Sequence, residues 1–192
     1  MNFLHQWFLG IIKPTRMIDE LRSKPAPFWG LWAVLIRFII TSLTTTLALY
    51  LLKRLPFSQS NLTFLSIEDY YLAEIFFLPL WGLGIWILMS SIAHLALRIT
   101  HKQSNFDIIL NIIGMGMLIP MPLLWLFDWI IIGLNLFTII IAAVSHTIFQ
   151  IWEASIQAIG FRKIFGLSTL GAVVLAIIIN AIYILLAIIF IR

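Results

Sequence analysis

The sequence contains no cysteine and few charged residues. The absence of cysteine excludes disulfides, thiolate zinc sites and cysteine nucleophiles together. Charged residues make up only 10% of the 192 residues, against about 25% in an ordinary soluble domain. Hydrophobic residues make up 62%, and the mean hydropathy is +1.07. A soluble fold of this size still exposes about 30% of its unfolded surface, so it could not keep so much apolar surface from water. The composition therefore predicts an all-α integral membrane protein.

Sequence motifs of catalysis are missing as well. The chain has no HExxH, no G-x-S-x-G, no glycine-rich phosphate loop and no pair of aspartates at membrane depth, which disfavours an intramembrane hydrolase. The net charge of +4 comes from basic residues scattered at segment ends, without an aromatic-interleaved patch, so nucleic-acid binding is not expected. We therefore predict a protein that is not an enzyme, uses no cofactor and has membrane lipid as its first partner.

Apolar runs long enough to cross the membrane predict a bundle of five transmembrane helices. A crossing needs about 20 apolar residues, and the run from Phe106 to Trp152 is long enough for two. The turn within this run is predicted at Leu126–Trp129, around Asp128, because a turn at Pro120–Pro122 would leave an arm of about 14 residues, which is short for a crossing. The five spans are expected at about 28–52, 75–97, 106–126, 129–150 and 167–191 of a single domain, 1–192.

Basic residues are distributed unequally between the two sets of loops. Eight lysines and arginines fall on the side of the N-terminus and three on the other side. Positive charge remains in the cytoplasm, which predicts a cytoplasmic N-terminus and a C-terminus outside. Residues 1–26 are expected to lie along the cytoplasmic membrane surface, and residues 58–71 form the one sizeable outer loop. The eight residues on the N-terminal side are Lys13, Arg16, Arg22, Lys24, Arg98, Lys102, Arg162 and Lys163; the other three are Lys53, Arg54 and Arg192.

Three passages resemble the Yip family of five-span membrane proteins. GIIKPTRMIDELRSKPAPFWGLWAVLI resembles the opening of its bacterial and archaeal members, and FDIILNIIGMGMLIPMPLLWL is similar to its third span with a late proline. In IWEASIQAIGFRKIFGLSTLGAVVLAIII, the residues Trp152, Gly160 and Ser168 stand at landmarks of the family. The resemblance implies five spans, a cytoplasmic N-terminus and a prokaryotic-type protein of the cell inner membrane. Eukaryotic members act with Rab GTPases, but no Asp-Leu-Tyr-Gly-Pro-like motif precedes the first span here, so Rab binding is not carried over.

Polar residues within the spans are the candidate functional residues, because polar groups are costly at membrane depth. We expect a polar cluster in the cytoplasmic half, with His94, His146 and Glu153 as its candidate metal ligands. Each candidate also has a simpler interpretation. The two histidines can be ordinary helix-end residues, and Glu153 can be a solvated residue. Arg37 can be a side chain that reaches the lipid headgroups. Pro120 and Pro122 are expected to break the third span, and Glu74 to mark the outer interface. Asn135 and Asn180 are read as interhelical hydrogen-bond residues. The other expected cluster members are Asn111 and Arg37, and Gln150 is expected at a similar depth, on the same helical face as His146 and Glu153.

Two functions fit these features, and both stay open. One is a non-enzymatic scaffold that organises membrane or partner proteins. The other is a channel, transporter or permease component that uses the polar cluster. Small residues at four-residue intervals, such as Ala172 and Ala176, allow close helix packing and also permit a homo-oligomer.

Overall fold

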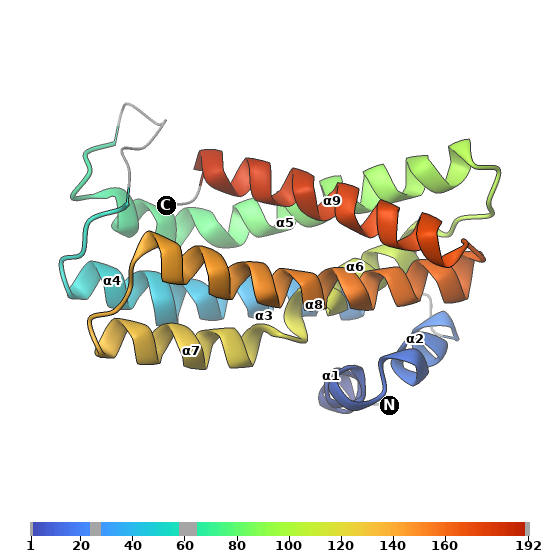
Figure 1. The fold of residues 1–192 in the computed structure, drawn as a ribbon, viewed down its shortest axis with the longest axis horizontal. Helices are drawn as coiled ribbons and strands as arrows, with labels where there is room; N and C mark the ends of the chain where they lie inside the picture. Colours follow the sequence, from blue (N-terminus) through green and yellow to red (C-terminus); the bar gives the residue numbers. More distant parts are fainter. Residues whose placement is uncertain (1, 24–27, 58–64, 191–192) are drawn as a thin grey trace.

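The computed structural model describes residues 2–23, 28–57 and 65–190, and this part of the chain forms helices without strands. Five helical segments are long and apolar enough to cross a membrane, as expected (Figure 1). The first comprises α3 (Phe28–Thr41), a π-helical turn η1 (Ser42–Thr46) and α4 (Leu47–Leu51). The others are α5 (Tyr70–Ile99), α6 (Phe106–Leu118) with α7 (Met121–Gly133), α8 (Ile139–Phe165) and α9 (Thr169–Phe190).

Helix α6 is the centre of the bundle. Every residue from Ile108 to Leu118 is buried, because α3, α5 and α8 pack around this helix. Helix α9 packs against α5 and α8, and its outer face carries exposed apolar side chains such as Leu170 and Leu185. Such a face is stable in lipid and costly in water, so the tertiary structure agrees with the membrane class predicted from composition.

Helices α3 and α6 approach each other backbone to backbone. A Cβ atom on Gly114 would lie 2.6 Å from the Cα atom of Gly30 and 2.5 Å from its carbonyl oxygen. The Gly30 amide, one of the free donors in the first turn of α3, donates to the Asn111 side chain at 2.8 Å. Asn111 therefore caps α3 from a neighbouring helix, and this interaction requires the close approach that the two glycines permit.

The third span is broken, as the two prolines predict. Helix α6 ends at Leu118 and α7 begins at Met121. Neither Pro120 nor Pro122 has an amide hydrogen, so Gly116 and Leu118 lose the donors that would continue the helix. The turn expected at Leu126–Trp129 is wrong, because α7 continues through these residues to Gly133 and α8 begins only at Ile139. Asp128 is buried in α7 instead of lying in an exposed turn.

Two short helices precede the first span. Helix α1 (Phe3–Ile12) and α2 (Pro14–Arg22) contact each other, and both contact α6. Met17, Ile18 and Leu21 form the buried face of α2, which also packs on α8. Together α1 and α2 cover one part of α6 and α8, and α7 contacts the same two helices beyond the proline break (Figure 1).

The two ends of the bundle are named here by the helices that lie there. At the α2 end, α5 passes into α6 and α8 into α9; at the α4 end, α7 passes into α8 and α9 finishes (Figure 1).

Candidate functional site

A buried ion pair joins the first and fourth spans. Arg37 of α3 and Glu153 of α8 lie 2.8 Å apart, with side chains 7% and 1% exposed. The same Arg37 nitrogen, Nη1, also donates to the carbonyl oxygen of Met117 at 2.9 Å, and Nη2 donates to the Tyr183 hydroxyl at 3.1 Å. The guanidinium also lies near the ring of Tyr183, 5.3 Å from its centre. Arg37 thus contacts α6, α8 and α9 at once.

The proline break supplies one of these acceptors. The last carbonyl groups of a helix have no partner within that helix, and Met117 lies in the last turn of α6. Since the chain turns at Pro120 before α7 begins, the Met117 oxygen is left for a donor from outside. Arg37 fills that role, so the break in the third span and the ion pair belong to one arrangement.

The polar contacts continue from α8 into α9. Gln157 Nε2 donates to Glu153 Oε1 at 3.2 Å, and Asn180 Nδ2 donates to Gln157 Oε1 at 2.6 Å. Asn180 Nδ2 also donates to the Ala176 carbonyl at 2.8 Å. We call Arg37, Glu153, Gln157, Asn180 and Tyr183 the central polar network. It links three spans through side chains and a fourth through a backbone carbonyl.

The structure brings together only some of the residues expected to cluster. Arg37 and Glu153 meet, and Asn180 joins them as an interhelical hydrogen-bond residue. Asn111 is buried but binds the start of α3 instead. His94 lies near the end of α5, where Nδ1 is 3.0 Å from the Ser104 hydroxyl and the ring packs on Phe106.

Gln150 also stays apart from the central polar network. Its Nε2 atom is buried without a hydrogen-bond partner in the described part of the chain. Asn135, the other residue read as an interhelical hydrogen-bond partner, follows α7 and accepts from the Arg54 side chain at the α4 end.

His146 belongs to a second polar site. Its Nε2 lies 3.4 Å from Asp128 Oδ1, and Thr45 of η1 donates to Asp128 Oδ2 at 3.3 Å. The expected meeting of His146 with His94 is wrong, because α8 starts at Ile139 rather than near residue 129. That shift carries His146 toward the α4 end, whereas His94 is near the α2 end. Within the described residues no group of three potential ligands could hold a metal ion.

Two members of the central polar network were not anticipated. Gln157 follows Glu153 by four residues, and Tyr183 follows Asn180 by three, so each lies on the same helical face as a residue that was singled out. Helical spacing was therefore the signal that could have found them. Gln157 is fully buried, which its position well inside α8 explains.

Two cavities of the described chain lie away from the central polar network. One, of about 310 Å³, lies at the α2 end and is lined by Thr15, Ile159, Arg162 and Lys163. Another, of about 20 Å³, lies at the α4 end beside Glu74. Neither is lined by a residue of the network. The side chains of the network bind one another and backbone, and Asn180 Oδ1 is buried without a hydrogen-bond partner among the described residues.

These features define a multi-span α-helical membrane protein with a buried polar junction between its helices. The family model of the Yip1 domain matches residues 9–191, which is nearly the whole chain. The protein belongs to this family, as the resemblance of its three passages implied. No curated protein and no solved structure matches the chain.

Proposed function

We propose that the protein is a non-enzymatic membrane protein that organises membrane or partner proteins. The observation that supports this proposal is that the two charged side chains of the central polar network are paired with each other and with neighbouring groups. The guanidinium of Arg37 has three partners, and the carboxylate of Glu153 has two. A transport site needs polar groups that remain open to a substrate, whereas these groups serve helix packing.

The experiment is a flux measurement on the full chain reconstituted in liposomes. A scaffold gives proton, sodium, potassium and small-solute fluxes equal to those of protein-free liposomes. The matched variant is Arg37→Met with Glu153→Gln, which removes the charges of the network and keeps similar side-chain volumes. A flux that the wild type supports and this variant lacks would contradict the scaffold proposal.

Photocrosslinking in the native membrane tests the organising role directly. We choose two lipid-facing positions, Ile148 on α8 and Leu185 on α9, which are 60% and 61% exposed. A scaffold should form discrete crosslinked adducts with other proteins, including a second copy of this chain. These adducts should be more abundant at one of the two positions than at the other. Adducts with lipid alone at both positions would argue against it.

A transport component is the second candidate function. Two buried carboxyl groups outside the network favour it. Glu74 Oε2 has no hydrogen-bond partner in the described residues, and Asp128 contacts the half-exposed His146 and the Thr45 hydroxyl. The same flux assay distinguishes a transport component from a scaffold. If the protein transports a solute, Asp128→Asn and Glu74→Gln should abolish the flux.

The orientation that we propose has the α2 end in the cytoplasm. Arg16, Arg98, Lys102, Arg162 and Lys163 support it, since they lie at that end and basic loops remain cytoplasmic. The α4 end, where α9 finishes, then faces outward. The resemblance to bacterial and archaeal members supports a place in a prokaryotic cell membrane.

A further inference from the structure

Glu74 is a buried carboxyl group outside the central polar network. It lies four residues after the start of α5, about 6 Å along the helix axis, and is only 4% exposed. Oε2 is buried without a hydrogen-bond partner in the described part of the chain. An ionised carboxylate in apolar surroundings is costly unless a cation or a donor compensates it. The ionised side chain therefore requires a cation or a donor, and Oε2 has no hydrogen-bond partner among the described residues to supply it.

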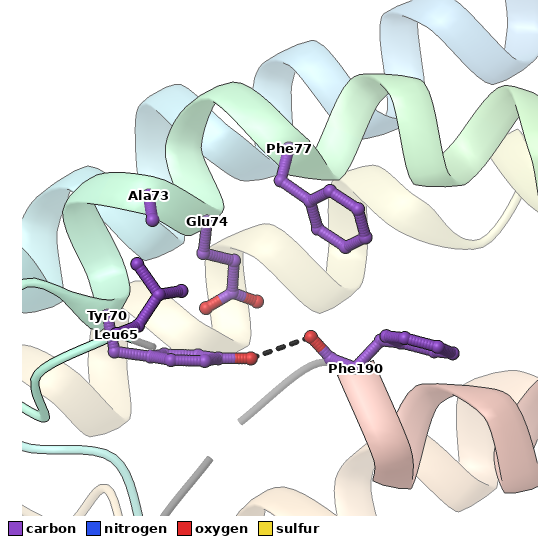
Figure 2. Close-up of a pocket in the computed structure, with 6 residues that line it drawn as sticks. All are labelled: Leu65, Tyr70, Ala73, Glu74, Phe77 and Phe190. Carbon is purple, nitrogen blue, oxygen red and sulfur yellow. Dashed lines mark hydrogen bonds between the residues drawn. The ribbon is translucent and has the colours of Figure 1, made fainter. Parts of the chain in front are cut away.

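A small cavity adjoins this carboxyl group. Figure 2 shows the Glu74 side chain directed into the space between Tyr70, Phe77 and the end of α9. Its volume of about 20 Å³ accommodates one water-sized ligand, since such a ligand needs about 10–15 Å³. The remaining lining is apolar, from Leu65 and Ala73. The cavity is thus too small for an organic substrate.

The walls of the cavity favour a positive occupant. Tyr70 donates its hydroxyl hydrogen to the Phe190 carbonyl at 2.6 Å, which places two more oxygen atoms beside the Glu74 carboxyl group (Figure 2). The faces of aromatic rings, here Tyr70 and Phe77, carry partial negative charge. Oxygen ligands and ring faces attract a cation and repel an anion.

We propose that Glu74 and this cavity form a binding site for one small monovalent cation, either a proton or Na⁺. Both ions neutralise the carboxylate, and both fit a space of one water molecule. The site lies one helical turn from the α4 end, so an ion reaches it from that side of the membrane over a short path. This proposal does not depend on the scaffold proposal, because an ion that binds without crossing the membrane produces no flux in the liposome assay.

Among the residues that the structure describes, other titratable groups near the cavity are few. Tyr70 lines the cavity and Tyr71 interacts with Glu74 from the same helix, while Tyr50 of α4 packs against the apolar cluster that contains both tyrosines. Glu68 and Asp69 lie exposed in the turn before α5. The lining contributed by α9 is a phenylalanine and its backbone carbonyl. Glu74 is therefore the group whose occupancy the experiment follows.

The test is the melting temperature, Tm, of the full chain in lipid nanodiscs from about pH 5 to about pH 9, with Na⁺ or with a bulky organic cation. A ligand that binds the native state raises Tm, so the wild type should lose Tm as the proton leaves at high pH. If the ion is Na⁺ as well, adding Na⁺ at high pH restores Tm, whereas K⁺ does not. If it is the proton alone, Na⁺ has no effect. Glu74→Gln should give a Tm that no longer follows either ion.

The control variant is Glu68→Gln, which removes an exposed carboxyl group in the turn before α5 and leaves Glu74 intact. It should keep the wild-type response to the ion. If wild type and Glu74→Gln respond in parallel to pH and to Na⁺, the site does not exist.

Chemical modification of Glu74 is a second test of ion binding at this site. A hydrophobic carbodiimide reacts with protonated carboxyl groups, so mass spectrometry should find the adduct on Glu74. Na⁺ at ten times its dissociation constant should slow this reaction about tenfold if Na⁺ occupies the site. An adduct rate unchanged by both Na⁺ and pH would overturn the proposal.

Discussion

The Arg37–Glu153 pair carries opposite charges at membrane depth, where a lost partner cannot be replaced by bulk water. A buried ion pair contributes little over apolar residues of the same size, but removal of one partner leaves a bare charge and costs about 3–5 kcal/mol. The residue-scale role of the pair is thus to specify how α3, α8 and α9 fit together.

We expect Arg37→Met to lower the free energy of unfolding by about 3–5 kcal/mol, because Glu153 then keeps Gln157 as its one partner among the described residues. The double variant Arg37→Met with Glu153→Gln should recover much of this loss. Calorimetry in detergent micelles measures both. Arg16→Met is the control: that side chain is 64% exposed, and its pair with Glu20 contributes at most about 1 kcal/mol. A loss for Arg37→Met no larger than for this control would contradict the structural role.

At the scale of elements, the contact of α3 with α6 depends on the absence of a side chain. We expect Gly114→Ala to destabilise the protein by about 1–3 kcal/mol, because the new methyl group would overlap the backbone of Gly30. Gly84→Ala is the matched control, since nothing lies within 4 Å of its Cβ position. There the better helix propensity of alanine should stabilise α5 by up to about 1 kcal/mol. Equal Tm shifts for the two variants would show that the close approach does not matter.

Helix α2 is held by its apolar face more than by its charges. Met17 is fully buried, whereas Asp19 and Lys163 form an ion pair with side chains 56% and 38% exposed. Met17→Ala should therefore loosen α2 and cost about 2–5 kcal/mol if the helix cannot close the gap. Hydrogen exchange of the α2 amides measures this, with Asp19→Asn as the variant expected to leave exchange nearly unchanged. Faster exchange in Asp19→Asn than in Met17→Ala would show that the ion pair, and not the apolar face, holds α2 in place.

At the scale of the whole molecule, the bundle has two ends of different charge, and its sides are apolar. Because the chain has no cysteine, single-cysteine variants carry no background. We expect Gln103→Cys, at the α2 end, to react with a membrane-impermeant reagent from the cytoplasm, and Glu68→Cys, at the α4 end, to react from outside. Both residues are exposed in loops. Reaction of both from the same side would contradict the five-span arrangement.

Composition and local pattern determined the class of the protein, the number of spans and the break at Pro120, because each of these follows from nearby residues alone. The Yip resemblance also rested on local passages. The turn near Asp128 was misplaced because the one charge in an apolar run was weighted above the weaker turn signals that follow it. Asn135 takes a left-handed conformation, with φ of 61°, and Thr138 caps the start of α8. Asp128 is buried instead where α7 packs against η1 and Thr45 binds it.

Only the tertiary structure decided which polar groups meet. Arg37 and Glu153 are 116 positions apart, and their contact depends on the rotation and the axial shift of two helices. In a helix that is apolar on nearly all sides, periodicity gives little indication of rotation. For the same reason the sequence could name Glu74 as a polar residue near one end of a span, while its burial against Tyr70 and Phe190 arises from the packing of α5 with α9.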